Sequence, residues 1–291
     1  MSLNPPVLAP GDPFDVDDAS VISALRSPKR LRIELLAGLV VALALIPEAI
    51  SFSILAGVDP QVGLFASFTM AVTISIVGGR AAMISGATGA IALVVHPVVE
   101  DYGLDYLIAT VLLGGAIQVA LSLTGAAKLM RFVPRSVMVG FVNALAILIF
   151  TAQLPELIDV PALVYPLVGI GLAMLVFVPR FMRAVPAPLV VIVLLTAVTI
   201  VGGLDIPTVG DKGELPSSLP SLLIPDVPYN LDTLGIIFPY AFAVAIVGLL
   251  ESLMTAKLVD DITDTHSDKT REGWGQGVAN IVTGFFGGMG G

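Results

Sequence analysis

Long apolar segments, separated by short polar ones, run through the 291-residue chain. A helix needs about 20 predominantly apolar residues to cross the hydrocarbon core of a bilayer. We therefore predict an all-α polytopic membrane protein. The candidate spans lie at residues 35–57, 61–78, 84–99, 104–124, 136–154, 161–178, 186–203, 233–255 and 274–288.

Composition supports a membrane protein and excludes several other classes. Charged residues make up 13% of the chain, against roughly 25% in soluble proteins. The absence of cysteine and the presence of only two histidines argue against disulfides, thiol chemistry and a zinc site. The net charge of -9, without a basic patch, indicates no nucleic-acid partner. No catalytic motif such as HExxH or GxSxG is present, so we expect no enzyme and no cofactor.

The basic residues favour one orientation in the membrane. If the N-terminal segment 1–30 is cytoplasmic, alternating spans place thirteen of the fourteen basic residues on that side, as the positive-inside rule requires. Only Lys212, in the long loop 204–232, falls outside. We expect a multi-pass protein of the cell membrane with a cytoplasmic N-terminus. The thirteen are Arg26, Lys29, Arg30, Arg32, Arg80, Lys128, Arg131, Arg135, Arg180, Arg183, Lys257, Lys269 and Arg271.

Some stretches depart from the plain pattern of a membrane helix. One contains Glu48 directly after Pro47, so we expect a break in the first span. Another contains Glu251, with Thr255 one helical turn later on the same face. Ionisable groups deep in a bilayer are costly and usually mark a site or pathway. These two carboxylates are candidates to carry a proton or bind Na⁺, and the structural alternative is that they only hold neighbouring helices. The departures cover residues 46–60, 78–91 and 248–263.

The stretch 78–91 predicts a half-helix. A span ends at a Gly pair, an extended piece "AAMIS" follows, and the helix resumes for about fifteen residues, too few to cross the membrane. The helix therefore begins near the bilayer midplane, where its first N–H groups and the helix dipole form an anion site. Ser85 and Thr88 add hydroxyls, and Gly86 permits close approach to the backbone. The alternative is an ordinary Ser/Thr N-cap among small packing residues.

A short internal echo indicates two repeats. "VTISIVGG" at 72–79 and "VTGFFGG" at 282–288 each end a span with a Gly pair, and each follows a span with an intramembrane glutamate. Because each repeat then has seven spans, an odd number, the second repeat would be inverted in the membrane. The half-helix that should face the first one is missing, so we expect the first part of a longer protein. The predicted segments are 1–30 (cytoplasmic), 31–232 (first repeat with its outer loop) and 233–291 (start of the second repeat, ending before span ten).

Four blocks of sequence resemble the SulP family of sulfate permeases: "PEAISFSILAGVDPQVGLFASF", "GGRAAMISGATGAIALVV", "RFVPRSVMVGFVNALAILIFTAQLPEL" and "ESLMTAKLVDDITDTHSDKTREGWGQGVANIVTGFFGGMGG". The resemblance implies a 7+7 inverted-repeat fold, a frequent homodimer, and in many members a cytoplasmic STAS domain. It also implies an anion site between the half-helices of spans 3 and 10. The matching positions are Ser85, Gly86, Ala87 and Thr88.

The resemblance further implies residues that couple transport to an ion gradient. Glu251 and Thr255 match the positions that bind Na⁺ in sodium-coupled bicarbonate members, and Glu48 matches a glutamate of proton-coupled members. We therefore predict a secondary active transporter of sulfate, bicarbonate or dicarboxylate that works by alternating access. The alternatives are a nucleobase–cation symporter of the same fold and an anion channel.

Overall fold

The computed structural model describes residues 25–125, 134–182 and 186–291. The basic residues Lys128, Arg131 and Arg183 lie outside this part of the chain. Within it, a helix corresponds to each of the nine predicted spans. The helices are α2 (Pro28–Ala56), α3 (Pro60–Val77), α4 (Gly89–Tyr102), α5 (Leu104–Leu123), α6 (Arg135–Gln153), α7 (Val164–Phe181), α8 (Ala187–Gly202), α9 (Leu231–Thr263) and α10 (Lys269–Phe285), with short 3₁₀ turns η2 (Leu154–Leu157) and η3 (Val209–Lys212).

Length and composition confirm the membrane class. Among the described helices, 6 are long and apolar enough to span a bilayer: α2, α3, α5, α6 with η2, α7 and α9. The 16 residues of α8 are apolar but fewer than a full span requires. The helices α4 and α10 are shorter or more polar, and both are largely buried against other helices.

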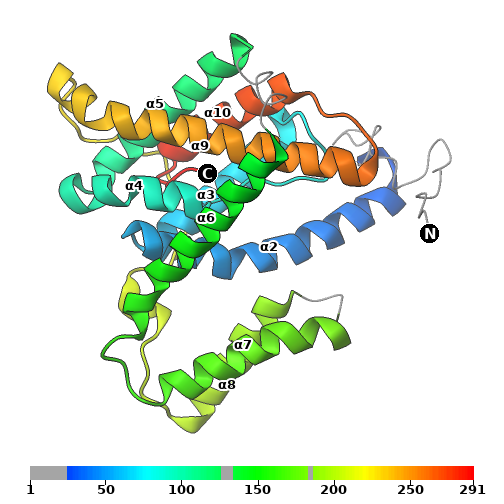
Figure 1. Cartoon of the computed structure of the whole chain (residues 1–291), viewed down its shortest axis with the longest axis vertical. Coiled ribbons are helices and arrows are strands. Elements are labelled where there is room, and N and C mark those ends of the chain that lie inside the picture. The colour runs from blue at the N-terminus through cyan, green and yellow to red at the C-terminus, as the bar shows by residue number, and fades with distance from the viewer. Residues whose placement is uncertain (1–24, 126–133, 183–185) are drawn as a thin grey trace.

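The helices form two groups. Six of them, α2–α5, α9 and α10, pack together into what we call the bundle, with α10 in contact with α3, α5 and α9. The helices α7 and α8 pair with each other beside the bundle, where α8 contacts α2, and α6 runs between the two groups (Figure 1). The main apolar core lies inside the bundle, around Ile91, Val95, Leu107, Val111 and Met289.

The expected break in the first span is wrong. Helix α2 is continuous for 29 residues and contains Pro47 in its interior. The Ser51 hydroxyl donates to the Pro47 carbonyl at 2.9 Å. A proline removes one backbone hydrogen bond, whereas a break inside a bilayer would leave several backbone groups without partners, each costing several kcal/mol. The helix therefore continues through the proline.

The third predicted interruption, at 248–263, is also absent. Helix α9 runs unbroken through this stretch and on to Thr263, with Pro239 inside it. Polar side chains such as Glu251 do not interrupt a helix when they face protein or a cavity instead of lipid. Both predicted breaks, in α2 and in α9, fail for one physical reason. In a membrane, the cost of leaving backbone N–H and C=O groups without hydrogen bonds exceeds the effect of one proline or one polar side chain.

The half-helix prediction is confirmed. Helix α3 ends at Val77, the chain then runs without helix through residues 78–88, and α4 begins at Gly89. Its 14 residues span about 21 Å, less than the roughly 30 Å of the hydrocarbon core. Thr88 is the N-cap, and its hydroxyl oxygen accepts from the Ile91 N–H at 3.3 Å. Thr88 is thus an N-cap, as the structural alternative in the sequence analysis expected, and it lies at the N-terminus of a half-helix.

The second Gly pair has a similar structural setting. Helix α10 ends at Phe285, and residues 286–291 return without helix into the bundle, where the chain terminus lies among α3, α4 and α9 (Figure 1). The hydroxyls of Thr69 in α3 and Thr283 in α10 are 2.8 Å apart and form a buried hydrogen bond. The two helices therefore pack against each other, while the inverted symmetry of the repeats stays a prediction.

Candidate functional site

A cavity of about 240 Å³ lies where the non-helical segment before α4 meets α2, α9 and α10. All of the site residues predicted from the sequence line it, although they come from three separate parts of the chain. The fold therefore brings these residues together, and their binding roles stay predictions. The lining consists of Leu45, Glu48, Met83, Ile84, Ser85, Gly86, Ala87, Thr88, Gly248, Glu251, Ser252, Thr255, Gln276 and Gly291.

The N-terminus of α4 forms one wall of the cavity. Its backbone is fixed from behind, because the Ala87 N–H donates to the Ser67 hydroxyl at 3.3 Å. A Cβ atom at Gly89 would lie 2.6 Å from Cδ1 of Ile149 and 2.9 Å from the Phe52 ring, so a larger residue there would displace these side chains. Partial positive charge at this helix end favours an anion in the cavity.

Glu251 forms the opposite wall, from α9. The Thr88 side chain, which caps the half-helix, lies beside this carboxylate on the cavity wall. The Oε2 atom of Glu251 is buried and has no hydrogen-bond partner among the described residues. Buried carboxylate oxygens are normally paired, so this one is available to a proton or a cation.

The other two predicted coupling residues lie at the edge of the cavity. Glu48, on α2, and Thr255, on α9, are both exposed in this chain. No hydrogen bond or ion pair joins Glu48 to the residues that the structure describes. Glu251 is therefore the more buried of the two carboxylates, and Glu48 is the more accessible one.

Sequence reasoning did not identify Gln276, which lines the cavity from α10. Its side chain is 3% exposed, and its Oε1 accepts from the Ser85 hydroxyl at 2.8 Å. A sequence signal existed in the polar residues of the ninth span, which recur three or four positions apart and so share one helix face. A polar face in a membrane helix must meet protein or water. The face consists of Glu272, Gln276, Asn280 and Thr283, all buried.

The lining contains two carboxylates and neither lysine nor arginine. The described residues also contain no cluster of His, Asp or Glu suited to a metal ion. The positive electrostatic contribution to the cavity therefore comes from backbone N–H groups and the α4 dipole. An anion and two ionised carboxylates would repel one another in so small a space.

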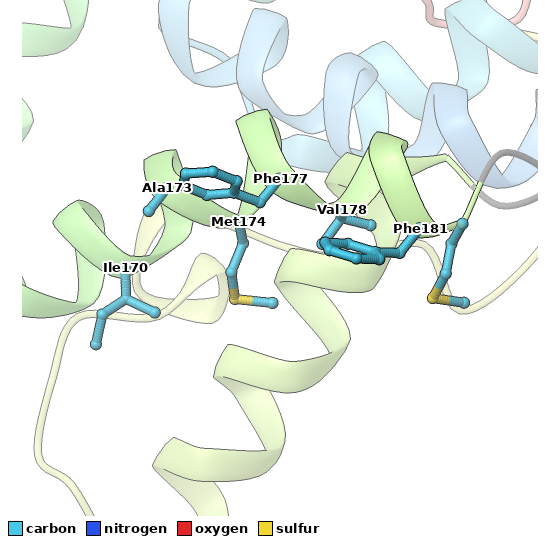
Figure 2. Close-up of a pocket in the computed structure, with 7 residues that line it drawn as sticks. Ile170, Ala173, Met174, Phe177, Val178 and Phe181 are labelled. Atoms are coloured by element: carbon cyan, nitrogen blue, oxygen red, sulfur yellow. The ribbon is translucent and has the colours of Figure 1, made fainter.

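Two other hollows in the described chain are lined mostly by apolar side chains and differ from this cavity. One, of about 280 Å³, follows a single face of α7 (Figure 2), and its lining of seven apolar side chains offers no hydrogen-bond donor. A second, of about 480 Å³, lies mostly between α7, α8 and the long loop. At its edge Lys212 forms an ion pair with Glu156 at 2.5 Å. Lys212, the one basic residue that the predicted orientation places outside, therefore has a carboxylate partner.

The sequence was compared with families of known proteins. A model of the sulfate permease family matches residues 31–165 and 163–291. The chain belongs to this family. The protein YbaR of Bacillus subtilis (strain 168), provisionally named a sulfate transporter, is 58% identical over 261 residues, covering 90% of this chain and 55% of that protein. The bicarbonate transporter BicA of Synechocystis sp. is 27% identical, covering 90% of this chain and 51% of its own length.

Solved structures confirm the fold of the family. The transmembrane domain of a cyanobacterium bicarbonate transporter BicA matches with a TM-score of 0.78 at 23% identity, covering 91% of this chain and 74% of that one. The chain spans about half the length of the curated relatives it matches. The resemblance read from the sequence blocks is therefore confirmed at the level of family and fold.

Proposed function

We propose that this chain supplies part of a secondary active transporter for small anions such as sulfate, bicarbonate or dicarboxylates. The observation that carries the proposal is that one cavity holds both the N-terminus of α4 and the unpartnered Oε2 atom of Glu251. Family membership supports a transporter, because relatives are named for sulfate and bicarbonate transport, and gives no support to an enzyme.

The anion would bind at the α4 N-terminus. Its oxygens would accept from the first N–H groups of α4, which have no intrahelical partners, and from the Thr88 hydroxyl. The Ser85 hydroxyl would donate to the anion only by leaving its present acceptor, Oε1 of Gln276. No full positive charge is present among the lining residues, so binding would depend on oriented dipoles. Such a site suits a small anion that keeps part of its hydration shell when it binds.

Coupling to a cation follows from the charges of the lining. A site with two carboxylates and no basic side chain holds an anion well only when at least one carboxylate is neutralised. A proton on Glu48, which is accessible, or Na⁺ held by Glu251 and the Thr255 hydroxyl would remove this repulsion. The anion and the cation would then bind more tightly together than separately, as a symporter requires.

The arrangement of the helices supports alternating access. Helix α6 packs against the bundle through Ile149 and Ala152, close to its C-terminal end, and leaves most of its other side chains exposed. In this proposal the group α6–α8 and the bundle move against each other during transport. We place the protein in the cell membrane with a cytoplasmic N-terminus and, when complete, as a homodimer.

Transport by the intact protein in proteoliposomes tests the proposal. Uptake of sulfate, bicarbonate and dicarboxylates would be measured under imposed H⁺ or Na⁺ gradients, for wild type, Glu48→Gln and Glu251→Gln. We expect saturable, gradient-driven uptake in wild type, and loss of gradient dependence in at least one variant with anion exchange retained. Glu34→Gln, an exposed carboxylate on the same helix as Glu48, is the matched control.

The result can also favour one of the alternatives. Non-saturable flux would indicate an anion channel, and competition by uracil in place of anions would indicate a nucleobase–cation symporter. If both glutamine variants keep wild-type coupling, the assignment of Glu48 and Glu251 as coupling residues is wrong.

A further inference from the structure

The two non-helical segments of the bundle cross each other at glycines. Gly291 lies against the backbone of Gly86, and a Cβ atom at Gly291 would overlap the Gly86 carbonyl oxygen and lie 2.8 Å from the Met70 sulfur. The crossing sits on the wall of the cavity, since both glycines line it. At the crossing itself neither segment is helical, and the helix-end bonds of the second segment stop at the Gly288 N–H. Other groups must therefore hold the two segments in register.

Two amide side chains of α10 make that connection. Asn280 accepts from the Gly291 N–H at 2.9 Å and donates to the Gly291 carbonyl at 2.9 Å. Gln276, one turn earlier, donates to the same carbonyl at 2.8 Å and accepts from the Ser85 hydroxyl at 2.8 Å. Gln276 therefore bonds to both crossing segments at once.

The orientation of each amide is determined by its partners. Gly291 offers one donor and one acceptor, and Asn280 pairs with both of them. The Asn280 amide nitrogen also donates to Oε1 of Gln118 on α5 at 2.8 Å. Both Gln276 and Asn280 are almost fully buried, so reversed amides would bring like groups together without water to relieve them. Gln276 must therefore turn its amide nitrogen toward the Gly291 carbonyl and its amide oxygen toward the Ser85 hydroxyl.

We propose that Gln276 and Asn280 form a clamp that positions the crossing segments, and with them the backbone N–H groups at the α4 N-terminus, for the anion. Gln276 and Asn280 are positioning residues in this scheme, since they act through Ser85 and the backbone. The effect on transport rests on the proposed anion site, whereas the effect on the segments does not. Without the clamp the segments would have to be ordered when the anion binds, which weakens binding.

Hydrogen exchange and transport kinetics of the intact protein test the clamp together. Gln276→Met keeps the side-chain volume and removes both hydrogen bonds. We expect amide exchange in residues 80–88 and 286–291 to speed up at least about tenfold without any anion present. The KM for the transported anion should rise about tenfold with little change in maximal rate, as expected for the loss of two hydrogen bonds. Gln153→Met, on α6, is the matched control.

A double substitution separates positioning from general support. If Gln276 acts through Ser85, Ser85→Ala and Ser85→Ala with Gln276→Met should raise KM to a similar extent. Unchanged exchange in Gln276→Met would overturn the clamp, and faster exchange with an unchanged KM would overturn its role in anion binding. If wild type takes up no anion, the proposed function fails, and the exchange rates alone still decide whether the clamp exists.

Discussion

Removal of the Glu272 carboxylate should destabilise the bundle strongly. Glu272 lies in the first turn of α10 and is fully buried. Its Oε2 accepts from the Gly79 N–H at 2.8 Å, and its Oε1 accepts from the Ser252 hydroxyl at 2.9 Å. The side chain therefore joins α10 to α9 and to the turn that follows α3.

The size of the effect follows from those two bonds. Glu272→Leu leaves one buried donor, the Ser252 hydroxyl, and one part-buried donor, the Gly79 N–H, without acceptors. At about 1–3 kcal/mol each, the free energy of unfolding should fall by about 2–6 kcal/mol. Glu272→Gln can still accept from Gly79 through its oxygen, and its amide nitrogen can donate to Ser252, whose hydroxyl is able to accept. That variant loses only the charge-assisted part of the bonds, about 1 kcal/mol.

Thermal unfolding of the intact protein in detergent, followed by far-UV circular dichroism, measures the difference. With about 2–4 °C for each kcal/mol, we expect Tm to fall on the order of 10 °C in Glu272→Leu and by a few degrees in Glu272→Gln. Glu100→Gln is the matched control, because that carboxylate is largely exposed and contacts His96 at 3.8 Å, a type of pair worth about 0–1 kcal/mol.

A specific result would refute this reasoning. If Glu272→Leu melts within a degree or two of Glu100→Gln, the two bonds contribute little to stability. Ser252→Ala in the Glu272→Leu background removes one of the two donors left without an acceptor. It should therefore recover part of the lost stability. A further loss there would mean that packing, and not unsatisfied hydrogen bonding, determines the effect.

Two further substitutions test contacts near the same turn. Gly79→Ala would place a Cβ atom against the Asp268 carbonyl and the Glu272 N–H, so we expect Tm to fall by several degrees. Gly235→Ala in α9 is the control, because nothing lies within 4 Å of its Cβ, and it should melt close to wild type. Equal melting temperatures for the two variants would contradict the packing described. Arg80→Gln removes a buried cation that pairs with Asp260 at 3.3 Å and donates to Thr265 at 2.7 Å, which should cost about 3 kcal/mol. Lys257→Gln, from an exposed pair with Asp261, should cost less than about 1 kcal/mol, and similar thermal shifts for these two would refute the difference.

Sequence reasoning located the half-helix because its signal is chemical and local. The Gly pair at 78–79, the extended "AAMIS" and the short apolar run after Thr88 each restrict the backbone. The continuity of α2 and α9 was missed for the opposite reason. A proline or a glutamate changes one hydrogen bond or one side chain, and the decision to continue the helix depends on the surrounding bilayer and bundle.

Gln276 shows why the candidate site was only partly predictable. Its type and position gave no sign of its partners, because Ser85 and Gly291 come into reach only after α10 packs against α3 and α5. The four-residue spacing to Glu272 and Asn280 was visible in the sequence and indicates a protein-facing side of the helix. The polar groups that this face of α10 contacts, however, are determined only when the helices pack together.

The segment before α4 depends on helices that are made much later in the chain. In the described residues, Gly79, Arg80 and Ser85 bond to side chains on α9, α10 and the loop between them, 183 to 193 positions away. Until those partners arrive, this non-helical backbone at membrane depth lacks acceptors and donors for its polar groups, which is costly in lipid. The half-helix and the crossing segments must therefore settle together, in a late step with contacts of long sequence separation. A site assembled in this way couples the position of Ser85 to the packing of α9 and α10. Substitutions at Glu272 or Arg80 should therefore alter the cavity even though neither residue lines it.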